Sequence, residues 1–284
     1  MSIKVSIIIP TYHDWKRLAI CLDALEKQTF PKEEFEILVV NNDPKDQTPS
    51  NFYLPSNCIL LNEGKPGSYS ARNTALKLVK GEIIGFTDSD CIPDKDWIRN
   101  AFLLFEKHPD CTRIAGHIEL FFKSDKLTLA EMYEKVYAFR QDFAAKVGAS
   151  VTGNMFAYKK LLDEVGDFNE TLMSGGDYEW SMRAKALHSK IMYGQDVVLQ
   201  HPARHELDEL IKKTKRLGSF YGKSKTKSVF RFFKYLIPPF NTFADAKKLP
   251  FDQQIKVMYV RYFLNLTRSM EEVKIAFGKN ASRE

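Results

Sequence analysis

Two carboxylates stand one residue apart at the end of an apolar segment. Residues 83–86 are Ile-Ile-Gly-Phe, and Thr87, Asp88, Ser89 and Asp90 follow them. Side chains alternate between the two faces of a strand, so Asp88 and Asp90 would point the same way if the extended backbone continued. Oxygen ligands of this kind suit a hard divalent cation such as Mg²⁺ or Mn²⁺. The pair predicts a metal site, and a cation there could bridge to the diphosphate of a nucleotide.

Three other polar segments follow predicted strands or open a predicted helix. They are Pro10-Thr11-Tyr12, Asn41-Asn42-Asp43 and the Gly- and Pro-containing loop 64–73, which includes Arg72. A helix N-terminus shaped by such a loop favours an anion, and the Arg72 guanidinium can reach a phosphate or a ring edge. Each segment alone is also ordinary turn chemistry. Because open α/β sheets bind ligands at the carboxyl ends of their strands, we expect all of these segments to meet at one sheet edge.

The elements that must position these residues alternate between strand and helix. Strands are expected at Val5–Ile9, Phe35–Val40, Cys58–Leu61 and Ile83–Phe86, and helices over 18–25 and Ser70–Val79. The strands are short, buried, β-branched runs, and the helices show apolar residues at helical spacing. This alternation predicts an α/β fold with a mainly parallel sheet flanked by helices.

The pattern beyond Pro93 is mixed. We expect helices over Trp97–Phe105, Leu127–Ala145, Lys159–Val165 and Asp177–Leu187, strands over Arg113–Phe122, Ile191–Tyr193 and Val197–Leu199, and a strand or extended loop over Val151–Tyr158. From Leu207 onward the chain reads as helical, with a loop at Lys223–Lys227, aromatic-rich segments at Val229–Ile237 and Ile255–Leu266, and a stop at Pro238-Pro239. We therefore divide the chain into a domain at 1–205 and a basic helical extension at 206–284.

Composition limits the classes of protein to which the chain can belong. Its 284 residues are 44% hydrophobic, with no apolar run long enough to span a bilayer and no N-terminal signal pattern. Four scattered cysteines show neither metal-binding spacing nor a disulfide framework. We expect a cytoplasmic protein, or one bound peripherally at the inner face of the membrane.

Charge is concentrated toward the C-terminus. Residues 206–284 carry 17 Lys and Arg against 8 Asp and Glu, and the rest of the chain carries 25 against 28. Basic amphipathic helices with Phe and Tyr can lie on an anionic membrane. The alternative is that these helices pack on the N-terminal domain and leave their charges in solvent. No recognition motif accompanies the charge, so we expect no nucleic-acid partner.

The motifs, in this order and spacing, resemble family 2 glycosyltransferases of the GT-A fold. The resemblance covers about the first 205 residues and rests on segments 5–12, 70–73, 87–90, 152–155, 176–180 and His201-Pro202. It implies a Rossmann-like nucleotide-diphospho-sugar transferase fold. It also implies an inverting, Mg²⁺- or Mn²⁺-dependent transfer of a sugar from a nucleotide-diphosphate donor, usually a UDP-sugar. The acceptor would be a hydroxyl of a glycan or lipid-linked glycan in cell-surface polysaccharide synthesis.

The resemblance implies donor-binding roles for several of these residues. Tyr12 offers a ring for the base, with backbone contacts from Pro10 and Thr11. Asn42 stands where relatives often carry an acid that binds the base edge; an amide could still pair with uracil, but the identity of the base stays open. Arg72 would lie near the base or the diphosphate.

The remaining donor contacts would come from two later segments. Asp88, with Ser89 beside it, would face the ribose or the metal. Gly153 and Asn154 would line the donor-sugar pocket, because a small residue lets a sugar approach the backbone closely.

Metal and base roles follow from the same resemblance. Asp90 would be the main metal ligand with Asp88, and His201 a further ligand, although a structural histidine is an alternative and His205 a second candidate. Inversion needs a carboxylate that takes the acceptor proton, and Asp177 fits that role.

Asp177 opens a predicted helix, where a carboxylate suits the helix dipole, so a plain helix cap is the alternative role. The family usually has Glu-Asp at this point, whereas this chain has Gly176-Asp177. Glu179 is the fallback base, and we expect Arg183 to pair with a carboxylate.

Two rival functions stay open from the residues alone. A sugar-nucleotide nucleotidyltransferase would show a Gly-rich basic loop after the first strand, where this chain has Pro10-Thr-Tyr-His-Asp14. A non-catalytic nucleotide-sugar-binding module would fit the absence of an acid at Gly176 and at Asn42.

Overall fold

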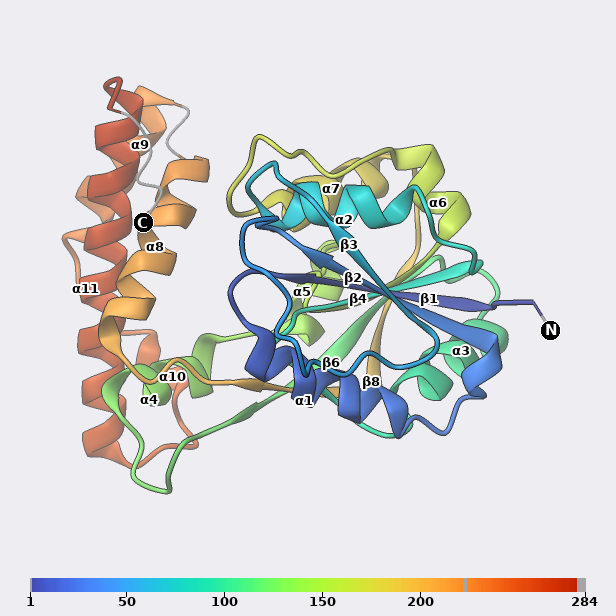
Figure 1. Cartoon of the computed structure of the whole chain (residues 1–284). Coiled ribbons are helices and arrows are strands. Elements are labelled where there is room, and N and C mark those ends of the chain that lie inside the picture. Colours follow the sequence, from blue (N-terminus) through green and yellow to red (C-terminus); the bar gives the residue numbers. More distant parts are fainter. Residues whose placement is uncertain (1, 222–223, 280–284) are drawn as a thin grey trace. The chain divides into compact units, whose positions relative to one another are not determined.

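The structure, a computed structural model, describes residues 2–221 and 224–279 and divides the chain into two compact units (Figure 1). The first unit comprises Met1–Glu119 and Phe139–His201, and the second comprises Leu120–Ala138 and Pro202–Glu284. The second unit therefore includes an internal segment, 120–138, that the sequence pattern places with the first domain.

The first unit is built on one mixed sheet. Its parallel part consists of β1 (Val5–Thr11), β2 (Phe35–Asn41), β3 (Cys58–Asn62) and β4 (Ile83–Thr87). Strand β7 (Asn154–Tyr158) pairs antiparallel with β4 and with β6 (Arg113–Phe121). Strands β8 (Ile191–Pro202) and β5 (Ile92–Pro93) complete the order β3-β2-β1-β4-β7-β6-β8-β5. The predicted mixed α/β sheet is confirmed, with its parallel pairings in β1–β4 and antiparallel pairings at β7 and β5.

Both faces of this sheet are buried under helices. Ile7 and Ile9 of β1 point into a core with α1 (Trp15–Glu26) and α3 (Trp97–Lys107), and Ile8 points into a second core with α2 (Ser68–Leu76), α6 (Lys159–Val165) and α7 (Gly176–Ala186). Figure 1 shows these two helix layers on opposite sides of the sheet. A mostly apolar strand such as β1 is typical of burial on both faces.

The structure differs from the predicted elements at two places in this region. The long helix expected over Leu127–Ala145 is two helices, α4 (Leu129–Tyr137) and α5 (Gln141–Val147). Ala138 leaves helical geometry with ψ 145°, and Phe139 has φ 49°, at the point where the chain passes between the units. The two short strands expected over 191–199 are one continuous strand, β8.

The second unit is helical and packs around its longest helix, α11 (Phe251–Ala276). Helices α4, α8 (Leu207–Tyr221), α9 (Lys225–Tyr235) and α10 (Thr242–Asp245) surround it. The loop expected over Lys223–Lys227 lies partly outside the described residues, and from Lys225 the chain is helix. In the described parts of the chain, every helix is too short or too polar to cross a bilayer.

Candidate active site

The carboxyl ends of the parallel strands bring the predicted segments together. Thr11 and Asn41 are paired in the β1–β2 register, and the Asn42 backbone N–H donates to the Thr11 carbonyl at 2.8 Å. Pro10 and Thr11 are buried at the end of β1, whereas the Tyr12 side chain beyond them is 64% exposed. A ring at the rim of a sheet edge is accessible for stacking on a planar ligand.

Asn42 fastens the loop that leads into α2. Its amide nitrogen donates to the carbonyl oxygens of Glu63 (3.1 Å) and Lys65 (2.8 Å), and its carbonyl oxygen accepts from the Gly67 N–H (2.7 Å). Gly67 has φ 120°, a conformation that a side chain would strain. Both amide hydrogens of Asn42 are therefore committed to this loop. The side-chain oxygen of Asn42 keeps one lone pair, which could accept a hydrogen bond from a nucleotide base.

Asp88 and Asp90 do not continue the strand. β4 ends at Thr87, and residues 88–91 form a turn closed by a bond from the Cys91 N–H to the Asp88 carbonyl (3.1 Å). The expectation that the two carboxylates share one face of an extended strand is therefore wrong, because the backbone bends between them. Asp88 instead pairs with buried Arg72 at 2.5 Å.

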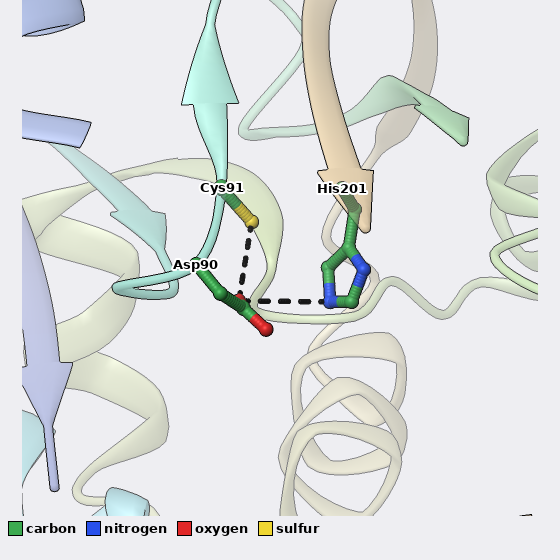
Figure 2. A group of neighbouring side chains, drawn as sticks. All are labelled: Asp90, Cys91 and His201. Carbon is green, nitrogen blue, oxygen red and sulfur yellow. Dashed lines mark hydrogen bonds and ion pairs between the residues drawn. The ribbon is translucent and has the colours of Figure 1, made fainter. Parts of the chain in front are cut away.

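Asp90 turns toward His201 (Figure 2). The Asp90 Oδ1 lies 3.7 Å from His201 Nε2 and 3.9 Å from the Cys91 sulfur. His201 comes from the end of β8, so the turn after β4 and a distant strand supply this cluster. Burial raises the pKa of the Asp90 carboxyl, and the attraction of His201 opposes that rise.

The Asp90 cluster has the donor chemistry for a divalent cation. One ligand atom each from Asp90, Cys91 and His201 lie within 4.8 Å of one another. Asp90 is half-buried beside an imidazole, and a cation would relieve the desolvation cost of its carboxylate. Carboxylate and imidazole are both ordinary ligands of Mn²⁺. Asp88 is not one of these three ligands: Arg72 donates to its Oδ1, and its Oδ2 faces Gly153, where an added Cβ would lie 3.4 Å away.

Two residues that the sequence analysis did not select also border this turn. Asp14 accepts from the Ser89 hydroxyl at 3.3 Å and from Arg17 Nε at 2.8 Å. Arg17 Nη1 also lies 3.5 Å from Asp90 Oδ2. Asp14 directly precedes helix α1 and Arg17 lies in its first turn, and this i, i+3 spacing lets the two side chains meet. That spacing is the sequence signal that could have found them.

Asp177 lies at the start of α7 against Tyr69 of α2. Its Oδ1 accepts the Tyr178 N–H at 2.9 Å and the Tyr69 hydroxyl at 3.4 Å. The same hydroxyl accepts the Gly176 N–H at 2.9 Å. Burial raises the pKa of Asp177, the Tyr178 N–H and the charge of Arg72 lower it, and Asp88 raises it again. A carboxyl so placed is suited to taking up a proton.

Tyr69 is the residue that the sequence analysis missed at this position. An added Cβ at Gly176 would lie 2.6–2.9 Å from the Tyr69 ring, so a side chain at Gly176 and the ring cannot share this space. Burial raises the pKa of the Tyr69 hydroxyl, which keeps it protonated as a donor toward Asp177. The glycine in place of the first family acid thus makes room for an aromatic ring.

The fallback candidates have other partners. Glu179 pairs with Arg183 at 2.9 Å, as the i, i+4 spacing predicts. His205 belongs to the second unit, where its Nδ1 lies 3.1 Å from the Glu131 carboxylate.

Asn154 differs from its expected place in a sugar pocket. Its side chain is fully buried, accepts from Trp97 Nε1 (2.9 Å) and donates to the carbonyls of His117 (2.8 Å) and Val197 (2.9 Å). These bonds join α3, β6 and β8, so this side chain has a structural role. Gly153, one residue earlier, lies beside Asp88, and its place in a donor-sugar pocket stays a prediction.

Comparison with known proteins identifies the family. The model of glycosyl transferase family 2 matches residues 6–166. The chain is 32% identical over 220 residues to the glycosyltransferase AglE of Haloferax volcanii, covering 75% of this chain and 71% of that protein.

Solved structures of glycosyltransferases share the fold. A mannosyltransferase from Pyrobaculum calidifontis, in complex with GDP-Man and Mn²⁺, aligns over 99% of this chain and 77% of its own with a TM-score of 0.59 and 18% identity. Residues 1–349 of Staphylococcus aureus TarS, in complex with UDP-GlcNAc, align over 99% of this chain and 93% of their own with a TM-score of 0.53 and 20% identity. The fold is therefore GT-A, and the chain belongs to glycosyltransferase family 2.

Proposed function

We propose that the protein is a metal-dependent inverting glycosyltransferase that takes a sugar from a nucleotide-diphosphate donor. The observation that carries the proposal is one sheet edge that holds the Arg72–Asp88 pair, a group of side chains around Asp90 that could bind a cation, and a partly buried carboxyl at Asp177. The fold neighbours crystallised with UDP-GlcNAc and with GDP-Man support a nucleotide-sugar donor. We favour a UDP-sugar, as the family resemblance implies.

Each residue has a definite part in the proposed reaction. Tyr12 stacks on the base, Asn42 orders the loop beside it, and Arg72 directs its guanidinium toward the donor phosphates. Asp90 and His201 would hold Mg²⁺ or Mn²⁺, and the chemistry supplied by that ion is neutralisation of the negative charge on the leaving diphosphate.

Asp177 is the proposed general base. Its carboxylate takes the proton of the acceptor hydroxyl as the acceptor oxygen bonds to the anomeric carbon. The bond from that carbon to the donor phosphate oxygen breaks, and its electron pair leaves with the nucleoside diphosphate. Attack opposite the leaving group inverts the configuration, so no covalent sugar–enzyme intermediate is needed. We propose a glycan or lipid-linked glycan as the acceptor.

Asp177→Asn is the decisive variant for the base. Transfer, followed as nucleoside-diphosphate release with a glycan acceptor panel, should fall by roughly 10²–10⁴-fold, the usual contribution of a general base. Donor binding by calorimetry should persist. The matched control is Glu179→Gln, which removes a neighbouring carboxylate that pairs with Arg183. Full activity of Asp177→Asn, or a loss in Glu179→Gln, would overturn the assignment.

Asp90→Asn tests the cation site. It should abolish the Mn²⁺-dependent part of donor binding, because the amide no longer offers a charged ligand. The control is Asp110→Asn, which alters an exposed ion pair with Lys190. Retention of metal-dependent binding in Asp90→Asn would rule out this cluster, and binding without turnover across the acceptor panel would favour a non-catalytic module.

A further inference from the structure

One side of helix α9 is an exposed surface of mixed aromatic and basic character. Lys227, Phe230, Phe233, Lys234 and Ile237 form it; we call it the α9 outer face. At 3.6 residues per turn the four helical positions fall within an arc of about 120°, with the lysines along one edge and the phenylalanines along the other. Ile237 follows two residues beyond the end of α9 at Tyr235. Phe230 is 71% and Ile237 68% exposed. Large side chains so exposed and so close together mark an interaction surface.

Other residues of α9 have partners within the second unit or are buried there. Ser228 is buried, and Arg231 pairs with the buried Glu272 of α11 at 3.0 Å. The Tyr262 hydroxyl of α11 donates to the Leu236 carbonyl at 3.0 Å. These contacts orient α9 and fix which of its faces points outward. The aromatic side chains are therefore not needed to hold the helix in place.

Charge decides which partner fits this face. Helix α9 contains Lys and Arg but no Asp or Glu. Phe side chains insert into the boundary of headgroups and acyl chains, and lysines beside them reach anionic headgroups, which adds about 1 kcal/mol per residue. A second copy of this chain would bring the same positive charges against each other. Repulsion therefore disfavours self-association through this face.

We propose that the α9 outer face binds the surface of an anionic lipid bilayer, with Phe230, Phe233 and Ile237 inserted and Lys227 and Lys234 against the headgroups. The inference goes beyond the proposed sugar transfer, because it concerns a surface outside the reaction site. It would hold the enzyme peripherally, at the place where a lipid-linked acceptor is found.

Vesicle co-sedimentation of the full chain tests the proposal. Wild-type protein should partition onto phosphatidylcholine vesicles with 30% phosphatidylglycerol at about 0.1 M salt and release in 1 M salt, with little binding to pure phosphatidylcholine. Phe230→Ser/Phe233→Ser and Lys227→Gln/Lys234→Gln should each lower partitioning roughly tenfold or more. Nucleoside-diphosphate release with a water-soluble acceptor should stay unchanged in both.

The matched control removes exposed apolar side chains elsewhere. Leu78→Ser/Phe143→Ser changes one residue of 50% and one of 56% exposure in the first unit and should leave partitioning as in wild type. Equal partitioning of wild type and both α9 variants would overturn the proposal, as would absence of wild-type binding. The proposal would also be overturned if light scattering showed a dimeric wild type and a monomeric Phe230→Ser/Phe233→Ser variant while the partitioning of the two onto vesicles was the same. The lysine variant decides the matter if the Phe variant does not fold.

Discussion

At the scale of single residues, the arrangement around Asp177 depends on complementarity between Gly176 and Tyr69. The ring occupies the space that a Cβ at Gly176 would take, and its hydroxyl joins the Gly176 N–H to the Asp177 carboxylate. Removing either partner changes the position of the proposed base. Tyr69 therefore acts as a positioning residue, since it touches Asp177.

Gly176→Ala should lower kcat at least tenfold, because the new methyl group forces the Tyr69 ring away from Asp177. Tyr69→Ala should also lower kcat. Because the smaller side chain leaves room for the methyl group, the double variant should lose less than the sum of the two single losses. Steady-state kinetics on the three variants measure this coupling. Gly64→Ala, whose Cβ would meet only Pro44 at an ordinary 3.8 Å, is the control. Additive losses would contradict the direct contact.

The raised pKa of Asp177 predicts the acid side of the pH profile. Burial favours the protonated form, so its midpoint lies above the ordinary 3.8. A base must be charged, and activity should therefore be full above this midpoint and fall as the pH drops through it. kcat measured at saturating donor and Mn²⁺, with circular dichroism to confirm folding, gives the profile. A rate that stays level down to pH 3.8 would contradict the assignment.

At the scale of elements, one buried amide joins three parts of the first unit. Asn154 on β7 binds Trp97 of α3, the His117 carbonyl of β6 and the Val197 carbonyl of β8. Gly116 makes this possible, because a Cβ there would lie 2.3 Å from the Asn154 oxygen. His201 is the penultimate residue of β8, so this junction also fixes the strand that supplies the imidazole beside Asp90.

Asn154→Ala should destabilise the fold by about 2–4 kcal/mol, since it leaves an indole N–H and two carbonyl groups buried without partners. Urea unfolding followed by circular dichroism measures the change. Asn100→Ala removes one bond to the Asp196 carbonyl at the surface and should cost less than 1 kcal/mol. Similar losses in the two variants would argue against the junction.

The sequence predicts the strands and helices of the parallel half closely, because apolar runs and helical spacing reflect burial in a two-faced sheet. It does not predict the break at Ala138, where apolar and aromatic residues continue on both sides while the two halves pack in different units. The alternation rule fails for Asp88 and Asp90 because it applies only while the strand lasts. Tyr69 is not predicted because its fit to Gly176 exists only in three dimensions.

At the scale of the whole molecule, the helical unit depends on α4 from the middle of the chain. Ala130 packs with Leu210, Val260 and Leu264, and the buried Met132 packs with Val257. Glu134, also on α4, is buried and pairs with Arg204 at 2.7 Å and Lys213 at 3.5 Å. These contacts explain why the segment 120–138 groups with residues far along the sequence.

Deleting residues 202–284 should therefore expose the apolar side of α4 and make the remaining protein prone to aggregation. Gel filtration and binding of a hydrophobic dye measure this outcome. The same deletion with Met132→Gln and Val136→Gln should recover part of the solubility, because the exposed side becomes polar. A monomeric truncation that binds no dye would contradict the dependence. Point variants in α9 are for this reason a cleaner test of lipid binding than truncation.

The peptide chain passes between the two units three times, after residues 119, 138 and 201. This connectivity limits how the protein can be recombined with its relatives. A chimaera joined at residue 201 alone would combine one parent's α4 with the other parent's α8 and α11, and their mismatched side chains would have to form a single core. Exchange of residues 202–284 succeeds only if 120–138 is exchanged with them, so the two segments of the second unit must diverge in evolution together.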